Sequence, residues 1–247
     1  MVGSIKYGKD IYSNIPFHKL LNNQKTLKSK ITRICNYFFT KHEGDALLPF
    51  RGFLIYGPPG TGKTEIIKRL VYDLDIDFER TNSGRVKLQF VDGGDIAAPK
   101  WGEGEQKLRE IFKVNSTNQN KEKTLILFDD VETFILGRNA GLAKEWHFSL
   151  NSIFFHQLDS LNVTKNIVVG TTNRLDLVDD ALKSRFYPFF LDLPNHEDLM
   201  NIAQKYAIAY NLDSRDLEHI SNLLKKDLKP SIRNVEHLIT DTVINKI

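Results

Sequence analysis

One glycine-rich run constrains the fold of this chain more than any other stretch. It reads Gly57-Pro58-Pro59-Gly60-Thr61-Gly62-Lys63-Thr64. This run fits the pattern G-x-x-x-x-G-K-[S/T], whose glycines let the backbone turn its N–H groups toward phosphate oxygens. The apolar run Gly52–Tyr56 precedes it, and apolar residues at helical spacing follow from Glu65 to Leu74. We therefore predict a phosphate-binding loop between the end of a buried strand and the start of a helix.

The last two residues of the motif have predicted roles toward a nucleotide. Lys63 is expected to reach the β- and γ-phosphates, and the Thr64 hydroxyl is expected to bind Mg²⁺. The N-terminus of the following helix adds a partial positive charge at the same point. We count the whole motif, together with the next residue Glu65, among the cofactor-binding residues.

Short apolar runs alternate with helical patterns along the first 194 residues. The predicted strands are Gly52–Tyr56, Val86–Val91, Leu125–Asp130, Ile167–Asn173 and Phe186–Leu193, and a loop is predicted at Asp92–Asp95. Strands that alternate with helices predict an α/β fold with a parallel sheet covered on both faces. From residue 195 to 247 only helical patterns occur. We therefore expect a nucleotide-binding domain over residues 1–194 and a small helical lid over residues 195–247.

Polar residues end two of the predicted strands. Asp129 and Asp130 follow the run L-I-L-F, and Asn173 follows I-V-V-G-T-T. The carboxyl ends of parallel strands form the edge where such sheets bind ligands. Asp129 is expected to hold Mg²⁺ directly or through water, and Asp130 to orient and polarise the attacking water. Asn173 is expected to hydrogen-bond that water or the γ-phosphate, while the alternative role of either acidic residue is to cap the following helix.

Composition excludes several classes of protein. A hydrophobic share of 41% and a charged share of 26% fit a globular chain, and no apolar run approaches the ~20 residues of a membrane span. Residues 1–10 contain no apolar core of a signal peptide. The single cysteine, Cys35, excludes an internal disulfide and indicates a reducing compartment, so we expect a cytoplasmic protein. The net charge of +3 is too small to indicate nucleic-acid binding alone.

Four motifs in sequence order give the chain a resemblance to the AAA+ ATPases, and within them to the AAA clade. G-P-P-G-T-G-K-T resembles the Walker A motif, and L-I-L-F-D-D-V-E at Leu125–Glu132 resembles the Walker B motif. Asn173 matches the sensor 1 position, and L-V-D-D-A-L-K-S-R-F onward to Pro194 resembles the second region of homology. The resemblance spans roughly residues 12–247. It implies Mg²⁺-dependent hydrolysis of ATP to ADP and phosphate, in a homo-oligomeric ring that is usually a hexamer.

The resemblance also implies roles for residues outside the strand ends. Arg185, in S-R-F, is similar to the arginine finger that reaches the γ-phosphate of a neighbouring subunit. Lys100-Trp101 resembles the pore loop, in which Trp101 would grip an extended polypeptide; packing of Trp101 in the core is the alternative. Arg233, in P-S-I-R-N-V, resembles the sensor 2 arginine of other AAA+ branches, which contacts the γ-phosphate in cis; a solvated lid residue is the alternative.

One residue departs from the pattern of the family. Relatives usually carry glutamate where this chain has Asp130, which is one methylene shorter. We therefore expect an active but slow ATPase. Glu132 would lie on the same side only if the strand continued that far, and we expect it to begin the next helix instead.

Three functions are compatible with these features. The leading one is a ring that uses ATP to remodel, unfold or disassemble a protein client through its pore, with the client recognised directly or through an adaptor. The second is a loader or replication ATPase that binds nucleic acid through Arg233 and the basic helix face at Lys25–Arg33. The third is a nucleotide-dependent scaffold that scarcely hydrolyses ATP, which the shorter Asp130 would favour.

Overall fold

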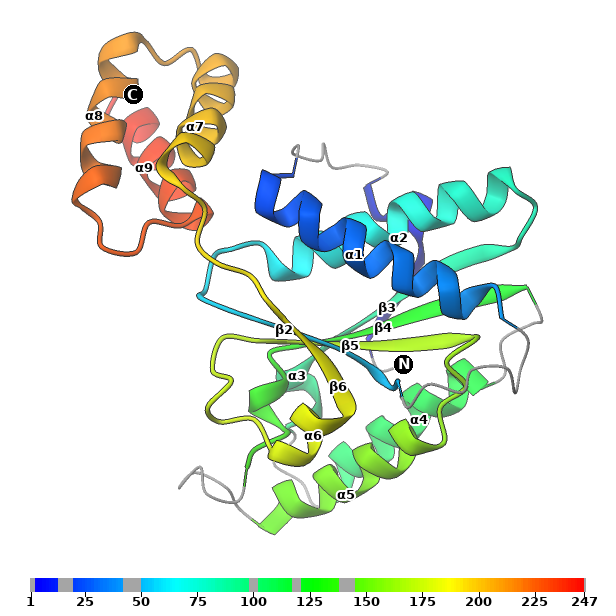
Figure 1. Cartoon of the computed structure of the whole chain (residues 1–247). Helices are drawn as coiled ribbons and strands as arrows, with labels where there is room; N and C mark the ends of the chain where they lie inside the picture. Colours follow the sequence, from blue (N-terminus) through cyan, green and yellow to red (C-terminus); the bar gives the residue numbers. More distant parts are fainter. Residues whose placement is uncertain are drawn as a thin grey trace.

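A computed structural model gives the fold over most of the chain. The described residues are 3–12, 20–41, 50–97, 102–116, 121–137 and 145–246. Within them, six strands form one twisted sheet in the order β1-β3-β4-β5-β2-β6, with helices on both faces (Figure 1). The strands are β1 Ser4–Tyr7, β2 Gly52–Tyr56, β3 Arg85–Asp92, β4 Glu122–Asp129, β5 Asn166–Thr172 and β6 Phe186–Phe190. Strands β2 to β6 are mutually parallel, which confirms the predicted α/β fold.

The helices divide between the two faces of the sheet and a separate bundle. Their bounds are α1 Asn22–Phe39, α2 Lys63–Arg80, α3 Gly93–Ile96, α4 Glu103–Ser116, α5 Glu145–Asp159, α6 Asp180–Arg185, α7 His196–Tyr210, α8 Ser214–Lys226 and α9 Ile232–Ile244, with 3-10 turns η1 Gly8–Tyr12 and η2 Val131–Thr133. Helices α1 and α2 cover one face, and α4 and α5 cover the other (Figure 1). Helices α7, α8 and α9 pack together beyond the carboxyl edge of the sheet and are called the lid bundle here.

Alternation along β2 shows how the two faces of the sheet are filled. Phe53 and Ile55 belong to the apolar cluster under α1 and α2, whereas Leu54 belongs to the cluster under α4 and α5. Successive side chains of a strand point to opposite faces, so a strand buried on both faces is apolar throughout. This explains why G-F-L-I-Y shows no polar alternation.

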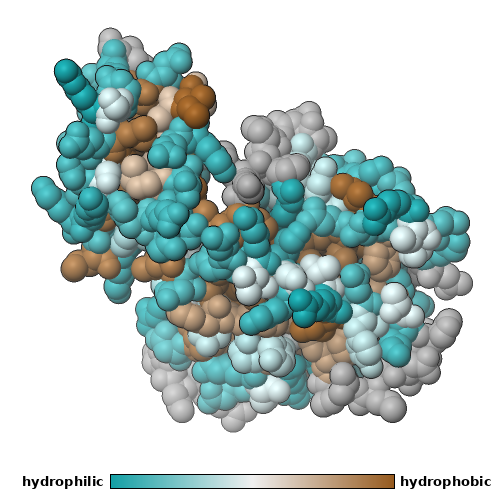
Figure 2. Space-filling model, turned by 45° about the horizontal axis from the view of Figure 1, so that its top comes forward, coloured by the Kyte–Doolittle hydropathy of each residue, from teal (hydrophilic) through white to brown (hydrophobic). Residues whose placement is uncertain are grey.

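The lid bundle has an apolar cluster of its own. It joins Leu199 and Ile202 of α7, Ile220 of α8 and Val235 of α9, and it also takes in Leu21, which precedes α1. The face in Figure 2 is mostly hydrophilic, with apolar patches over the lid bundle and at its junction with the rest of the chain. We propose residue 194 as the end of the nucleotide-binding domain and residue 195 as the start of the lid.

Two local expectations were wrong, and one strand was not predicted. The stretch predicted as a loop at Asp92–Asp95 instead contains the helix α3, which the Asp92 carboxylate caps by accepting from the Gly94 N–H at 2.8 Å. The last predicted strand ends at Phe190, because its neighbour β2 ends at the paired residue Tyr56. The strand β1 was not predicted, and it pairs antiparallel with β3 at one edge of the sheet.

Candidate functional site

The phosphate-binding loop lies where the sequence predicted it, between β2 and α2. Gly57 adopts φ +152°, and a Cβ there would lie 2.0 Å from the Leu191 carbonyl oxygen. Gly62 precedes α2 with φ +85°, a conformation that side chains with a Cβ rarely adopt. These two positions therefore require glycine for reasons of backbone geometry.

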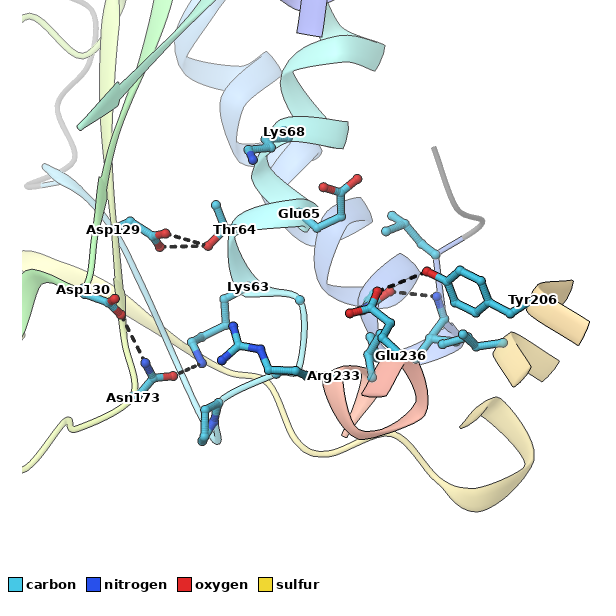
Figure 3. A pocket seen from close by; sticks show the side chains of 18 residues that line it. Lys63, Thr64, Glu65, Lys68, Asp129, Asp130, Asn173, Tyr206, Arg233 and Glu236 are labelled. Atoms are coloured by element: carbon cyan, nitrogen blue, oxygen red, sulfur yellow. Dashed lines mark hydrogen bonds between the residues drawn. The ribbon is translucent and has the colours of Figure 1, made fainter. Parts of the chain in front are cut away.

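A cavity of about 460 Å³ opens beside this loop, at the carboxyl edge of the sheet and under the lid bundle (Figure 3). Its walls come from the phosphate-binding loop, the ends of β4 and β5, the start of α1 and the helices α7 and α9. Ligand pockets in proteins usually measure about 300–1,000 Å³. The cavity is therefore large enough for a nucleotide.

Lys63 is buried at the centre of the site. Its Nζ donates to the carbonyl oxygens of Gly57 and Pro58, both at 2.9 Å, and to Asn173 Oδ1 at 2.6 Å. Burial lowers the pKa of Lys63. The negative charges of nearby carboxylates, that of Asp130 most of all, oppose this shift. Its three donors are thus held close to the cavity by polar groups that phosphate oxygens can replace.

The predicted metal-binding pair is in contact. Thr64 Oγ1 donates to the carboxylate oxygens of Asp129 at 2.8 and 3.0 Å (Figure 3). Thr171 Oγ1 also donates to Asp129. The described residues contain no cluster of three or more His, Cys, Asp or Glu side chains able to hold a metal. Mg²⁺, however, usually takes only one or two protein carboxylates and fills its shell with water and phosphate oxygens. One hydroxyl and one carboxylate at the same point fit that donor set.

Asp130 and Asn173 form the next pair. Asn173 Nδ2 donates to Asp130 Oδ1 at 3.1 Å, so one amide links the carboxylate to Lys63 (Figure 3). Asp130 lies outside β4 and has φ +52°, which turns its side chain out of the strand pattern. Burial, then the neighbouring Asp129 and Glu132 carboxylates, raises the pKa of Asp130.

Glu132 lies in η2, so the strand does not continue to it, as expected. Its side chain nevertheless turns back, and Oε1 accepts a hydrogen bond from the Asn173 backbone N–H at 3.1 Å. The second oxygen, Oε2, is buried and has no hydrogen-bond partner within the described residues. A role for Glu132 in the site could not be predicted from strand or helix periodicity, because a 3-10 turn brings its side chain back toward Asn173.

Arg233 adds a guanidinium to the cavity, which Lys63 and Lys68 also line. It lies in the first turn of α9, and Figure 3 shows its guanidinium beside the Lys63 side chain. The Ile232 N–H donates to the Gly60 carbonyl oxygen at 3.2 Å, which brings the start of α9 against the phosphate-binding loop. Cationic side chains that converge on one cavity suit a polyphosphate ligand.

The other end of the cavity is more apolar. Leu21, Ile202 and Ile232 line it together with Tyr206, whose hydroxyl donates to Glu236 Oε1 at 3.1 Å. Burial, followed by the Glu236 carboxylate, raises the pKa of Tyr206 to about 12. Leu21, Ile202 and Tyr206 lie outside every motif found in the sequence, and they come together here only because distant segments pack against one another.

Arg185, the predicted arginine finger, lies away from the cavity. Arg185 does not line the described cavity; its Nε and Nη2 contact the Asp159 carboxylate, each at 3.1 Å, and its guanidinium lies 4.9 Å from the Phe155 ring. Lys100 and Trp101 lie outside the described residues, so their predicted pore role stays a prediction.

No helix in the described part of the chain has the length and apolar character needed to cross a bilayer.

Comparison with known proteins gives consistent matches. The model of the ATPase family associated with various cellular activities (AAA) matches residues 53–191. Cell division control protein 48 homolog B of Arabidopsis thaliana is 32% identical over 69% of this chain and 28% of its own length. An AAA ATPase forming ring-shaped complexes from Bifidobacterium adolescentis is 32% identical over 66% of this chain and 31% of its own length. The chain thus spans about a third of these relatives or less.

The fold has close counterparts among solved structures. The crystal structure of the FIGL-1 AAA domain in complex with ADP aligns with 98% of this chain and 75% of its own, with a TM-score of 0.69 and 21% identity. At that level of identity the likeness concerns the fold.

Proposed function

The chain belongs to the AAA family of ATPases, and from that membership we propose that it binds ATP with Mg²⁺ and hydrolyses it to ADP and phosphate. One observation carries the proposal. Lys63, the Thr64–Asp129 pair and the Asp130–Asn173 pair converge on one cavity at the carboxyl edge of the sheet. A phosphate cradle, a metal-binding pair and a base next to a polar amide are the parts that phosphoryl transfer to water requires.

Each part has a distinct task in the proposed reaction. The apolar end of the cavity, formed by Leu21, Ile202 and Tyr206, receives the adenine ring of ATP, and the phosphate-binding loop receives the phosphates. Lys63 exchanges its contacts with the Gly57 and Pro58 carbonyls for phosphate oxygens. Thr64 and Asp129 would hold Mg²⁺, which when bound neutralises charge on the β- and γ-phosphates.

The proton of the attacking water goes to Asp130. A raised pKa makes this carboxylate a stronger base than an ordinary aspartate, and Asn173 fixes one of its oxygens at 3.1 Å. The short side chain limits its reach toward the cavity. We propose slow hydrolysis for that reason.

We further propose that the active form is a ring of identical subunits, a hexamer as is usual in this family, in which Arg185 of one subunit completes the site of the next. Within the described chain Arg185 is held by Asp159 and is absent from the cavity lining, so it is not available to the site of its own subunit. A relative that is named for ring-shaped complexes supports this arrangement. In a cytoplasmic ring of this kind, the proposed work is remodelling of a protein client, with Trp101 as the gripping residue.

Steady-state hydrolysis of ATP tests the enzymatic part. The wild-type chain should hydrolyse ATP only with Mg²⁺, and turnover per subunit should rise with protein concentration as the ring forms. Lys63→Ala should abolish turnover, whereas Lys30→Ala, an exposed change on α1, should not alter it. Turnover that stays flat from dilute monomer to assembled protein would contradict the shared site.

The client role has a separate test. Trp101→Ala should leave basal hydrolysis unchanged and abolish remodelling, and unchanged remodelling would refute the role of Trp101. Capture with the nucleotide-trapped variant Asp130→Asn identifies the client or adaptor. Hydrolysis stimulated by DNA in a salt-dependent manner would favour the loader function instead. Tight binding of ATP without multiple turnovers would favour the function of a nucleotide-dependent scaffold.

A further inference from the structure

Gln24 is a buried polar residue at the start of α1 whose amide is engaged at both ends. Only 3% of the residue is exposed. Its Nε2 donates to the Thr61 carbonyl oxygen at 2.8 Å, and its Oε1 accepts from the Leu21 backbone N–H at 2.9 Å. The partners fix the orientation of the amide, because a carbonyl can only accept and an N–H can only donate.

One end of Gln24 restrains the phosphate-binding loop. In a trans peptide the carbonyl and the next N–H point in opposite directions, so a fixed Thr61 carbonyl also fixes the direction of the Gly62 N–H. The neighbouring Gly60 carbonyl is fixed in the same way by the Ile232 N–H. A Cβ on Gly62 would lie 2.6 Å from Gln24 Nε2, which shows how closely the amide lies against the loop.

The other end of Gln24 leads to the lid bundle. Leu21, whose N–H it holds, is 7% exposed and packs in the apolar cluster of the lid with Leu199 and Val235. A single side chain therefore joins the backbone that offers N–H groups to phosphate with a residue that is part of the lid core.

We propose that Gln24 is a positioning residue that sets the shape of the phosphate-binding loop and couples nucleotide binding to the packing of the lid bundle. It would act through Thr61 and Gly62 on one side and through Leu21 on the other, without contacting the reacting atoms. The inference rests on the proposed binding of nucleotide to this cavity.

Two variants separate the two ends of the amide. Gln24→Leu keeps the approximate shape and removes both hydrogen bonds. Gln24→Glu keeps the acceptor for the Leu21 N–H but places a carboxylate oxygen against the Thr61 carbonyl. Gln106→Leu is the matched control, because Gln106 is exposed on α4, where its amide donates to Glu110 Oε1 at 3.0 Å.

Isothermal titration calorimetry with ADP measures how each variant changes the affinity for the nucleotide. We expect ADP to bind both Gln24 variants about tenfold more weakly than the wild-type chain, which corresponds to about 1.4 kcal/mol. An unmet hydrogen bond of a buried carbonyl costs an amount of this order. The control should bind within about twofold of wild type, the range of an exposed substitution.

A second readout distinguishes positioning from a general loss of stability. In the wild-type chain ADP should slow hydrogen exchange of lid amides in α7 and α9, and in Gln24→Glu this protection should be lost even at saturating ADP. If Gln24→Leu does not fold, Gln24→Glu alone decides. Wild-type affinity and wild-type lid protection in Gln24→Glu would overturn the inference while leaving the proposed function intact. Failure of the wild-type chain to bind ADP or ATP would overturn both.

Discussion

Replacement of Asp75 should release the N-terminal strand from the sheet and destabilise the whole nucleotide-binding domain. Asp75 lies in α2 and is 0% exposed. Its carboxylate accepts from Arg85 Nε and Nη2 and from the Val86 N–H, all at 2.8 Å. It also accepts from the Lys9 N–H at 3.0 Å, so one side chain joins η1, α2 and β3.

The size of the effect follows from these contacts. Removal of one partner from a buried ion pair costs about 3–5 kcal/mol, because the other charge loses its compensation. The side chain of Arg85 is 33% exposed and regains some water, which places Asp75→Ala near the lower end, at about 3 kcal/mol. In a chain of this size, that loss should lower the Tm by about 10 °C. Asp77→Ala, an exposed change one half-turn further along α2, should cost less than about 1 kcal/mol.

Thermal unfolding followed by circular dichroism provides the comparison. Hydrogen exchange adds the local result, since the amides of β1 should lose protection in Asp75→Ala and keep it in Asp77→Ala. Equal stability of Asp75→Ala and Asp77→Ala would refute the reasoning.

The same residue gives a dependence on pH. Burial alone would raise the pKa of Asp75, but the hydrogen bonds from Arg85, Val86 and Lys9 outweigh it and lower the pKa below the ordinary value of an aspartate. A carboxylate with a lowered pKa stabilises the fold at pH values above its unfolded pKa, and that contribution is lost as the pH falls through the folded pKa. The stability difference between wild type and Asp75→Asn should therefore be constant near neutral pH and shrink in acid. A difference that grows in acid would contradict this sign.

Three further predictions concern catalysis. Asp130→Glu should raise kcat in steady-state hydrolysis, because the longer side chain reaches further into the cavity, whereas Asp130→Asn should lower it by about 10²–10⁴-fold; a lower rate for Asp130→Glu would count against the shortened base. Glu132→Ala should lower kcat without weakening ADP binding, because it removes the acceptor for the Asn173 N–H; a change in ADP affinity alone would contradict this role. Arg185→Ala should reduce kcat by about 10³-fold or more and leave binding of fluorescent ADP intact; unchanged turnover would exclude Arg185 as the finger.

Strong local patterns explain what could be predicted from the sequence. The loop from Gly57 to Thr64 needs glycine at fixed positions and lies between a strand and a helix. Both requirements can be recognised in the residues of the loop and in the apolar patterns beside it. Asp129 and Asn173 could be placed because parallel strands end at a common edge. The contact between Thr64 and Asp129 follows from that topology.

What could not be predicted depends on contacts between distant segments. Strand β1 is only four residues long, and its place is set by Asp75 and by Glu122, which accepts from Tyr7 at 2.7 Å. Gln24 and Tyr206 enter the cavity from α1 and α7 because the lid packs there, and neither lies in a motif. Helix α3 is only four residues long and depends on a cap from Asp92. It could not be predicted, because its first two residues are glycines, which usually indicate a loop.

Mixing of two inactive variants tests the central claim, a site completed by a neighbouring subunit, most directly. Lys63→Ala subunits cannot hold ATP but still offer Arg185, and Arg185→Ala subunits hold ATP but offer no finger. Each alone should be nearly inactive, and a mixture should recover hydrolysis in proportion to the sites that pair an intact cavity with an intact Arg185. A mixture whose activity equals the sum of its two components would contradict the account.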